Sequence, residues 1–238
     1  MNFEPTMKID RRKSYYLMID TETCNGYTDD GGKTHLEDSL VYDVGIAVID
    51  KKGHIYESYS YTLADIFLNM LPQMRTCYYK EKLPQYWEEM WEGTRLCRSL
   101  WDIKRDIKAL CDKYDIKAIV AHNARFDVNA LNNTIRYVEC SKYRYFLPYG
   151  IPIWDTLKMS KVIANQKSYR RFCEENGYMT KHKTPRPKMT AEILYRYISG
   201  DNDFEERHTG LEDVKIESQI FAYCMKQHKK MDKLLYSA

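Results

Sequence analysis

Hydrophobic residues along this chain fall into short runs that alternate with amphipathic stretches. Five apolar or alternating runs have the length of β-strands, and residues 50–53 between the second and third have the chemistry of a hairpin turn. The five predicted strands are Tyr15–Ile19, Tyr42–Ile49, His54–Leu63, Ile116–Ala121 and Ile151–Trp154. Three strands followed by alternating helices and strands are typical of a mixed α/β layer structure.

Amphipathic stretches between these runs predict helices. In residues 96–114 the apolar side chains recur every three to four positions, as on a helix that packs against a sheet. The other predicted helices are residues 64–74, 84–92, 124–138, 155–164, 168–176, 190–198 and 211–228. Two polar segments rich in glycine or proline, Asn25–Ser39 and Gly177–Lys188, are predicted loops. Because no repeat or linker interrupts the pattern, we predict a single domain over residues 1–238, with a core at about 14–229.

Composition excludes some classes of protein. Apolar residues make up 44% of the 238 residues, an ordinary share for a globular protein. No apolar run reaches the roughly 18–20 residues that span a bilayer, and the N-terminus lacks the apolar core of a secretory signal. The seven cysteines are widely spaced and form no C-x-x-C pair, which argues against a structural zinc site. We therefore expect a cytoplasmic (intracellular) protein with no membrane partner.

The distribution of charge is more informative than the net charge of +3. Residues 160–190 contain eight basic and two acidic side chains, which gives this segment a net charge of +6. Such a segment either binds a phosphate backbone or forms a solvated basic face, and charge alone does not decide between the two. The candidate contacts to a phosphate backbone are Arg170, Arg171, Lys181 and Lys183.

Two carboxylates directly follow the first predicted strand. Asp20 and Glu22 are two positions apart, so they point to the same face of a strand, at the end where open α/β sheets usually bind ligands. Like charges so close together are costly, and a divalent cation removes that cost. Loop or helix-capping acids at a strand end give the same D-x-E pattern, so this motif alone is weak evidence for a site.

Two further motifs place polar residues where predicted helices begin. Asn123 and Asp127 follow the fourth strand, and His208 and Asp213 flank the start of the last helix. Each has a structural explanation, because acids in a first turn stabilise the helix dipole and asparagine or histidine can cap a helix or lie on the surface. A histidine beside a metal-binding aspartate can also take a proton from water, since its pKa lies near 6.5. Asp155 is predicted to cap the helix that follows it.

Together and in this order, the motifs resemble those of the DEDDh exonucleases, the DnaQ-like 3′→5′ exonucleases of the ribonuclease H-like fold. The first family motif, D-x-E followed by T, is matched by Asp20–Thr23, and the second, H-N-x-x-F-D, by His122–Asp127. The third, H-x-x-x-x-D, is matched by His208–Asp213, and the D-T-L triplet that precedes it by Asp155–Leu157. The resemblance implies a five-stranded mixed sheet, with three antiparallel strands, flanked by α-helices.

The resemblance also implies roles for the matched residues. Asp20, Glu22 and Asp213 would ligate the metal that activates the attacking water, and Asp20 would bridge to a second metal. Asp127 would complete the acidic cluster, and His208 would take the proton of the water. Two divalent cations, Mg²⁺ or Mn²⁺, suit these oxygen ligands. Further contacts to the terminal nucleotide are expected from Thr23, Cys24 and Asn123.

The predicted function is that of a metal-dependent 3′→5′ exonuclease that frees 5′-mononucleotides from nucleic acid with a free 3′ end. Single-stranded DNA is the favoured substrate, in proofreading or end trimming. One alternative is an exoribonuclease acting on RNA ends or short oligoribonucleotides, because the group that reads the 2′-OH cannot be located in the sequence. Another is a non-catalytic nucleic-acid-binding or polymerase-docking module, against which the five catalytic residues argue. The resemblance is compatible with a homodimer and with a polymerase partner, and no feature of the sequence indicates either.

Overall fold

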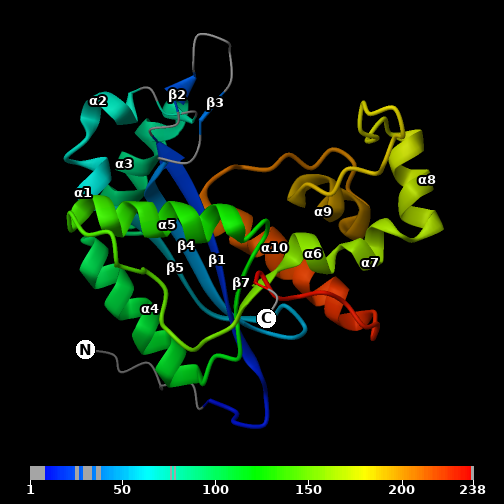
Figure 1. Cartoon of the computed structure of the whole chain (residues 1–238), viewed down its shortest axis with the longest axis horizontal. Helices are drawn as coiled ribbons and strands as arrows, with labels where there is room; N and C mark the ends of the chain where they lie inside the picture. The colour runs from blue at the N-terminus through cyan, green and yellow to red at the C-terminus, as the bar shows by residue number, and fades with distance from the viewer. Residues whose placement is uncertain are drawn as a thin grey trace.

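A mixed β-sheet forms the centre of the protein, with helices on both faces (Figure 1). Six strands of the described chain pair in the order β6-β5-β4-β1-β7-β8. The strand β4 runs antiparallel to both of its neighbours, and the other neighbouring strands are parallel to one another. These strands are β1 (Tyr15–Cys24), β4 (Leu40–Asp50), β5 (Ile55–Leu63), β6 (Leu96–Arg98), β7 (Ile119–Ala121) and β8 (Ile153–Asp155). The predicted α/β fold with a mixed sheet is confirmed.

The structure is a computed structural model that describes residues 9–24, 27–28, 34–35, 39–75, 77 and 79–236. Most of the predicted loop Asn25–Ser39 lies outside these residues. Within that loop, the backbone of β2 (Tyr27–Thr28) pairs with that of β3 (Thr34–His35).

The helices fall into two groups, one on each face of the sheet. Alternate residues of β1 serve the two cores: Leu17 and Ile19 pack toward α1–α5, and Tyr16 and Met18 pack toward α6–α10. No helix of the described chain is both long and apolar enough to cross a membrane. The helices are α1 (Ala64–Phe67), α2 (Leu71–Met74), η1 (Lys80–Lys82), α3 (Leu83–Glu92), α4 (Leu100–Tyr114), α5 (Arg125–Val138), α6 (Thr156–Met159), α7 (Lys161–Ala164), α8 (Lys167–Glu175), α9 (Ala191–Ser199) and α10 (Gly210–Lys226).

The described sheet has one strand more than the five predicted. Leu96–Arg98 pairs with β5 as the edge strand β6 instead of opening the predicted helix 96–114. The helix α4 begins at Leu100, where the side chain of Ser99 accepts a hydrogen bond from the backbone N–H of Asp102 (3.2 Å). Three residues are too few to show the alternation of a strand, which is why the sequence pattern missed this element.

Three other predicted elements have different bounds. The first strand continues beyond the apolar run Tyr15–Ile19 to Cys24, so the acidic motif lies at the end of β1, as the alternation argument required. The predicted helices 64–74 and 155–164 are each divided into two short helices, α1 with α2 and α6 with α7. Helix ends depend on local caps and tertiary contacts, which a periodic pattern does not record.

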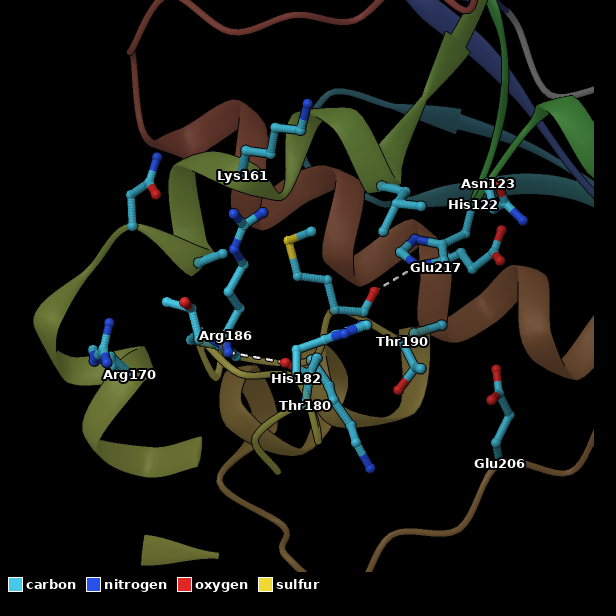
Figure 2. A pocket seen from close by; sticks show the side chains of 18 of the residues that line it. His122, Asn123, Lys161, Arg170, Thr180, His182, Arg186, Thr190, Glu206 and Glu217 are labelled. Carbon is cyan, nitrogen blue, oxygen red and sulfur yellow. Dashed lines mark hydrogen bonds between the residues drawn. The ribbon is translucent and has the colours of Figure 1, made fainter. Parts of the chain in front are cut away.

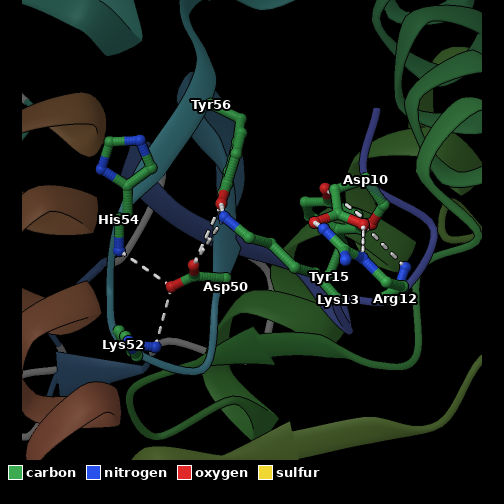
Figure 3. A network of polar contacts seen from close by, with 8 residues as sticks. All are labelled: Asp10, Arg12, Lys13, Tyr15, Asp50, Lys52, His54 and Tyr56. Atoms are coloured by element: carbon green, nitrogen blue, oxygen red, sulfur yellow. Dashed lines mark hydrogen bonds and ion pairs between the residues drawn. The ribbon is translucent and has the colours of Figure 1, made fainter. Parts of the chain in front are cut away.

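A polar network closes the hairpin end of the sheet, where β4 turns into β5 (Figure 3). The carboxylate of Asp50 accepts hydrogen bonds from the backbone N–H of Lys52 (2.8 Å) and His54 (3.3 Å) and from the hydroxyl of Tyr56 (3.0 Å). The ammonium of Lys13 lies 3.8 Å from the same carboxylate and donates to the Tyr56 hydroxyl. The network therefore ties the segment before β1 to the hairpin.

Candidate active site

Acidic residues from β1 and α10 meet at the carboxyl end of β1. The alternation of side chains along this strand directs Asp20 and Glu22 to the face that α10 covers. Asp213 lies in the first turn of α10, on the same face. Burial first, and then the charges of the surrounding carboxylates, raise the pKa of Asp20 well above its usual value. The site is therefore a group of buried acids that oppose one another's ionisation, and the charge of Lys82 offsets this only in part at Glu22 and Asp213.

Asp127 reaches this cluster from the other side of β1. It lies in the first turn of α5, is 2% exposed, and accepts a hydrogen bond from the hydroxyl of Thr21 (2.8 Å). Burial raises the pKa of Asp127 to about 7, although the Thr21 hydroxyl counteracts part of that shift. Its charge acts on Asp20 across the strand. Asp127 thus lies in the first turn of a helix, as the sequence predicts, and is also a member of the acidic cluster.

Two glycines allow α10 to approach the strands this closely. Gly45 of β4 pairs in register with Asp20, and Gly210 begins α10. A Cβ atom on Gly45 would lie 2.0 Å from the carbonyl carbon of Gly210, and one on Gly210 would lie 2.5 Å from the backbone nitrogen of Gly45. Real Cβ contacts are never so short, so a side chain at either position would push the helix away. The backbone contact holds Asp213 beside β1.

A buried aspartate fixes the start of the same helix. Asp43 pairs in register with Glu22 and is completely buried. It accepts hydrogen bonds from the backbone N–H of Gly210 (3.0 Å), the hydroxyl of Tyr86 (2.6 Å) and the guanidinium of Arg95. All of these donors are buried, so the charge is compensated within the chain. Asp43 therefore positions the first turn of α10 and is not free to bind a ligand.

His208 lies just before α10, in a left-handed backbone conformation (φ 51°). Its ring stacks on Tyr79, with centroids 4.7 Å apart and planes 14° apart, and the ammonium of Lys82 donates to its carbonyl oxygen (3.3 Å). Burial, and then the charge of Lys82, lower the pKa of His208 below 6.5. The ring is 37% exposed, and its Nδ1 lies 3.8 Å from a carboxylate oxygen of Glu206. His208 is therefore neutral near pH 7 and accessible to water.

The side chains of Glu22, Asp213 and His208 form a cluster whose ligand atoms all lie within 4.8 Å of one another. Burial and then the charge of Asp43 raise the pKa of Glu22 to about 9, and burial and then the charge of Glu206 raise that of Asp213 to about 8. The Oδ1 atom of Asp213 has no hydrogen-bond partner among the described residues. An unpaired buried oxygen within an excess of carboxylates fits a hard divalent cation such as Mg²⁺ or Mn²⁺.

Asn123 lies at the border of this site, where β7 leads into α5. Its backbone is left-handed (φ 59°), and its N–H donates to the carboxylate of Asp155 (3.0 Å). The same carboxylate accepts from the N–H of Leu157 (2.9 Å), so Asp155 caps α6 as the sequence predicts. Asn123 does not cap α5, whose N-cap is Ala124. Its side chain instead lines a cavity.

This cavity has a volume of about 1270 Å³ and extends from Asn123, Glu206 and Glu217 to the basic segment (Figure 2). Asp20, Glu22, Asp127, His208 and Asp213 are not among the residues that line it. Figure 2 shows Asn123, Glu206 and Glu217 on one side, and Lys161 and Arg170 on the other. The basic loop after α8 forms one wall, and its ends are joined by a bridge between Met179 and Pro187. The cationic side chains on the wall are Lys161, Arg170, Lys183, Arg186 and Lys188.

Only some of the residues predicted to contact the substrate line this cavity. Arg170 and Lys183 line the cavity, whereas Arg171 and Lys181 are exposed on α8 and the loop and are not part of its lining. At the end of β1, Thr23 is half-buried. Cys24 is 2% exposed and packs in the apolar core, so its thiol is not available to a ligand.

Three residues of the site were not predicted: Asp43, Glu206 and Glu217. An acid inside the otherwise apolar strand Tyr42–Ile49 was a usable signal for Asp43. Glu217 comes four positions after Asp213, on the same face of a helix, and this spacing was also visible. Glu206 lies in a polar loop, where the sequence pattern gives no signal.

No protein-family model matches the sequence, and no curated protein matches it. Solved structures are nevertheless similar. One is a 3′-exonuclease in a structure of the 3′-end specific recognition of a histone mRNA stem-loop; it aligns over 94% of this chain and 68% of its own, with a TM-score of 0.57 and 12% identity. Another is the nuclease domain of 3′hExo, a DEDDh family member bound to rAMP, which aligns over 95% of this chain and 100% of its own (TM-score 0.56, 12% identity).

The chain has the fold of the DEDDh 3′-exonucleases. A third structure, a full-length 3′-exonuclease, aligns over 97% of this chain with a TM-score of 0.52 and 12% identity. This agreement confirms the ribonuclease H-like fold that the three sequence motifs implied. At such low identity the likeness concerns the fold, and the activity has to be argued from the site.

Proposed function

We propose that this chain is a metal-dependent 3′→5′ exonuclease that hydrolyses the terminal phosphodiester bond of nucleic acid and releases a 5′-mononucleotide. The observation that carries the proposal is the meeting of Glu22, Asp213 and His208 within 4.8 Å of one another. They come from two distant segments of the chain and match two motifs of one exonuclease family. The DEDDh exonuclease fold supports the same conclusion.

The acidic cluster would hold the metal. Asp20, Glu22 and Asp213 offer oxygen ligands on the α10 face, and Asp127 offers one from the other side of β1. When bound, a pair of Mg²⁺ or Mn²⁺ ions stabilises charge on the attacking and leaving oxygens of an in-line displacement. The chain itself contributes the fixed positions of these carboxylates, through the contact between Gly45 and Gly210.

His208 is the proposed general base. Its lowered pKa leaves the ring free to take a proton from the attacking water near pH 7, and its exposed edge lets that water reach it. The stack on Tyr79 holds the ring in one orientation. Positioned general bases typically contribute 10²- to 10⁴-fold, so we expect His208→Ala to slow cleavage by about that factor.

The basic wall of the cavity would bind the phosphate backbone upstream of the 3′ end. Arg170 and Lys183 supply charge on that wall. We propose Arg171 and Lys181 as outer contacts to the same strand. Each neutralised phosphate contributes about −0.7 to the salt slope of single-strand binding. Replacing Arg170 and Lys183 by glutamine should therefore flatten the slope by about 1.4, and an unchanged slope would contradict this role.

The terminal nucleotide would bind where β1 ends. Thr23 offers a half-buried side chain there, and Cys24 offers its backbone because its thiol is buried. Asn123, at the border between the acidic cluster and the cavity, would contact the strand as it leaves the centre. These contacts would place the scissile phosphate against the carboxylates.

Single-stranded DNA is the first substrate to test, and RNA is a second candidate for a specific reason. Two of the three structural neighbours reported above are described with RNA or a ribonucleotide, a histone mRNA stem-loop in one and rAMP in the other. The 2′-OH is the group that separates the two substrates at a given site. Matched DNA and RNA oligonucleotides of one sequence therefore decide between them.

The test is cleavage of 5′-labelled single-stranded DNA and RNA in Mn²⁺, with EDTA and Asp20→Ala as inactive controls. A ladder that shortens from the 3′ end, and disappears in both controls, would support the exonuclease. Asp50→Asn is the matched control, because it removes an aspartate charge at the other end of the same strands. Binding of both oligonucleotides without cleavage would instead favour a non-catalytic binding module.

A further inference from the structure

Glu217 is a buried acid that the proposed mechanism does not yet use. It lies in α10, four residues after Asp213, so the two carboxylates share one face of the helix. Its side chain is 3% exposed. Hydrophobic residues of the helix, Val214, Ile220 and Phe221, are completely buried around it. A glutamate at such a position costs stability unless something pairs with its charge.

The described chain leaves part of this carboxylate without a partner. Its Oε2 atom is buried and has no hydrogen-bond partner among the described residues. The backbone of His122 is near enough to lower the pKa of Glu217, but it offsets only part of the rise caused by burial and by the charges of Asp127 and Asp213. Asp43 shows what a structural acid looks like in this protein, since Tyr86, Arg95 and Gly210 all donate to it. Glu217 therefore lacks the donors that a purely structural role would require.

The carboxylate of Glu217 lies near the acidic cluster. Its charge raises the pKa of Asp20, as do the charges of Asp127 and Asp213. In turn, Asp127 is the charged group that acts most strongly on Glu217. Glu217 also lines the cavity, on the side of Asn123 (Figure 2). It thus lies between the carboxylates of β1 and α5 and the path proposed for the substrate.

Glu217 differs from the other acids in its position. The ligand atoms of Glu22 and Asp213 lie within 4.8 Å of those of His208. Glu217 is outside that group and lines the cavity, while its charge acts on Asp20 and the charge of Asp127 acts on it. Asp20 and Asp127 alone would offer few ligands to a cation, because Thr21 already occupies one oxygen of Asp127. A further carboxylate with a free oxygen is what a hard divalent cation would need there.

We propose that Glu217 is a fifth carboxylate of the cation centre and helps to bind the divalent cation held by Asp20 and Asp127. The inference rests on the proposed function for the identity of the ligand, a Mg²⁺- or Mn²⁺-sized ion. It extends that function by assigning a metal-binding role to a residue outside the three sequence motifs.

The experiment is a titration of the full chain with Mn²⁺, followed by electron paramagnetic resonance and by calorimetry, without nucleic acid. The isosteric variant Glu217→Gln keeps the size and shape of the side chain and removes the charge. We expect one of two Mn²⁺ sites to weaken by at least about 10-fold, and up to about 100-fold, as on loss of a partner of a metal site. Glu212→Gln, in the first turn of the same helix and paired with Lys215, is the control and should bind as the wild type does.

Thermal unfolding of the metal-free variants tests the competing structural role. Removing an unpaired buried charge should leave the unfolding midpoint of Glu217→Gln unchanged or higher. A lower midpoint, or a variant that fails to fold, would mean that the carboxylate is structurally satisfied and would overturn the proposal. Mn²⁺ binding by Glu217→Gln equal to that of the wild type would overturn it as well.

The outcome of the Mn²⁺ titration can be distinguished from the outcome of the nuclease assay. If the wild type cleaves nucleic acid while Glu217→Gln binds Mn²⁺ normally, the exonuclease stands and the role of Glu217 fails. If no cleavage is found but Glu217→Gln still weakens one Mn²⁺ site, the cation centre has five carboxylates and the proposed reaction fails. Binding and catalysis are therefore tested independently.

Discussion

The two ends of the β1–β4 strand pair hold carboxylates in opposite states. At the hairpin end, burial would raise the pKa of Asp50, but hydrogen bonds from the backbone N–H of Lys52 and from the Tyr56 hydroxyl reverse the shift, and the pKa is lowered. At the other end, burial and neighbouring acids raise the pKa of Glu22 to about 9 and that of Asp213 to about 8. The same two strands thus carry a satisfied acid and an unsatisfied cluster.

The comparison teaches that burial of an acid does not by itself mark a functional site. Asp43 shows the same contrast within the site. It lies opposite Glu22 and is completely buried, but it accepts hydrogen bonds from three donors of the chain. What distinguishes Asp213 is that its buried Oδ1 atom has no hydrogen-bond donor among the described residues. Carboxylates left in that state are available to an external cation.

The largest effect on cleavage is expected from Asp213→Asn, which removes one acid of the unsatisfied cluster. We expect cleavage to fall by more than the roughly 100-fold that the loss of an outer-shell partner typically costs, because Asp213 would contact the metal itself. The metal-free protein should be as stable as the wild type or more stable, since one repelling charge is removed. Single-turnover cleavage in Mn²⁺ and thermal unfolding in EDTA measure the two effects. A variant that is inactive because it is destabilised would contradict this assignment.

The second test removes the acid that is satisfied within the site. In Asp43→Asn the buried Arg95 loses its charged partner, and breaking a buried ion pair from one side costs about 3–5 kcal/mol. Urea denaturation in EDTA measures this loss. Tyr86→Phe, which removes one hydrogen bond to the same carboxylate, should cost only about 1 kcal/mol. Equal losses in the two variants would show that the ion pair is not what stabilises this region.

The third test removes the acid at the hairpin end. Hydrogen bonds to a charged group contribute about 1.5–3 kcal/mol, so Asp50→Asn should lower the free energy of unfolding by about that amount. Cleavage by the folded variant should be unchanged, because the site lies at the opposite end of β1. Reduced cleavage at full stability would mean that the two ends are coupled.

The last test is the dependence of stability on pH, which has opposite signs at the two ends and is spread over several pH units. The raised pKa values of Glu22, Asp213 and Asp127 (about 9, 8 and 7) exceed the value near 4 of an unfolded chain. Their contribution is complete below pH 4 and is lost as the pH rises through 7 to 9. The lowered pKa of Asp50 works the other way, and its contribution is lost as the pH falls below about 4.

Thermal unfolding in EDTA between pH 5 and 9 measures the alkaline loss. We expect the free energy of unfolding to decline across this range, by on the order of 1 kcal/mol per pH unit for each proton that the folded state retains and the unfolded chain has lost. Mn²⁺ should remove this decline, and Asp213→Asn should reduce it. A metal-free protein that becomes more stable between pH 6 and 9 would contradict the raised pKa values.

The sequence predicted the parts of the site that motifs and strand alternation encode. Asp20, Glu22, Asp127, Asp213 and His208 were named from their spacing, and the structure brings the ligand atoms of the last two into reach of Glu22. The ribonuclease H-like fold followed from the order of those motifs and is confirmed. The roles of the five residues stay predictions until cleavage and metal binding are measured.

Other features depend on contacts between segments far apart in the chain. The periodicity of hydrophobic residues in the sequence gives no information about such contacts. Glu217 looks like one more helical residue until the backbone of His122 and the carboxylate of Asp20 are seen near it. The strand β6 exists because β5 offers an edge to pair with. Arg171 and Lys181 were grouped with Arg170 by charge, but position along the helix and loop separates them from the cavity wall.

The contact between Gly45 and Gly210 has a consequence for the choice of ion. Backbone meets backbone there, so no rotamer change can widen or narrow the space between β1 and the start of α10. If the carboxylates hold a cation as proposed, this fixed backbone spacing would limit the ionic radius that they can accommodate. Mg²⁺ takes its ligands at about 2.0–2.1 Å and Ca²⁺ at about 2.3–2.6 Å, with more of them. We therefore expect the site to favour Mg²⁺ over Ca²⁺ by size, even though both carry the same charge.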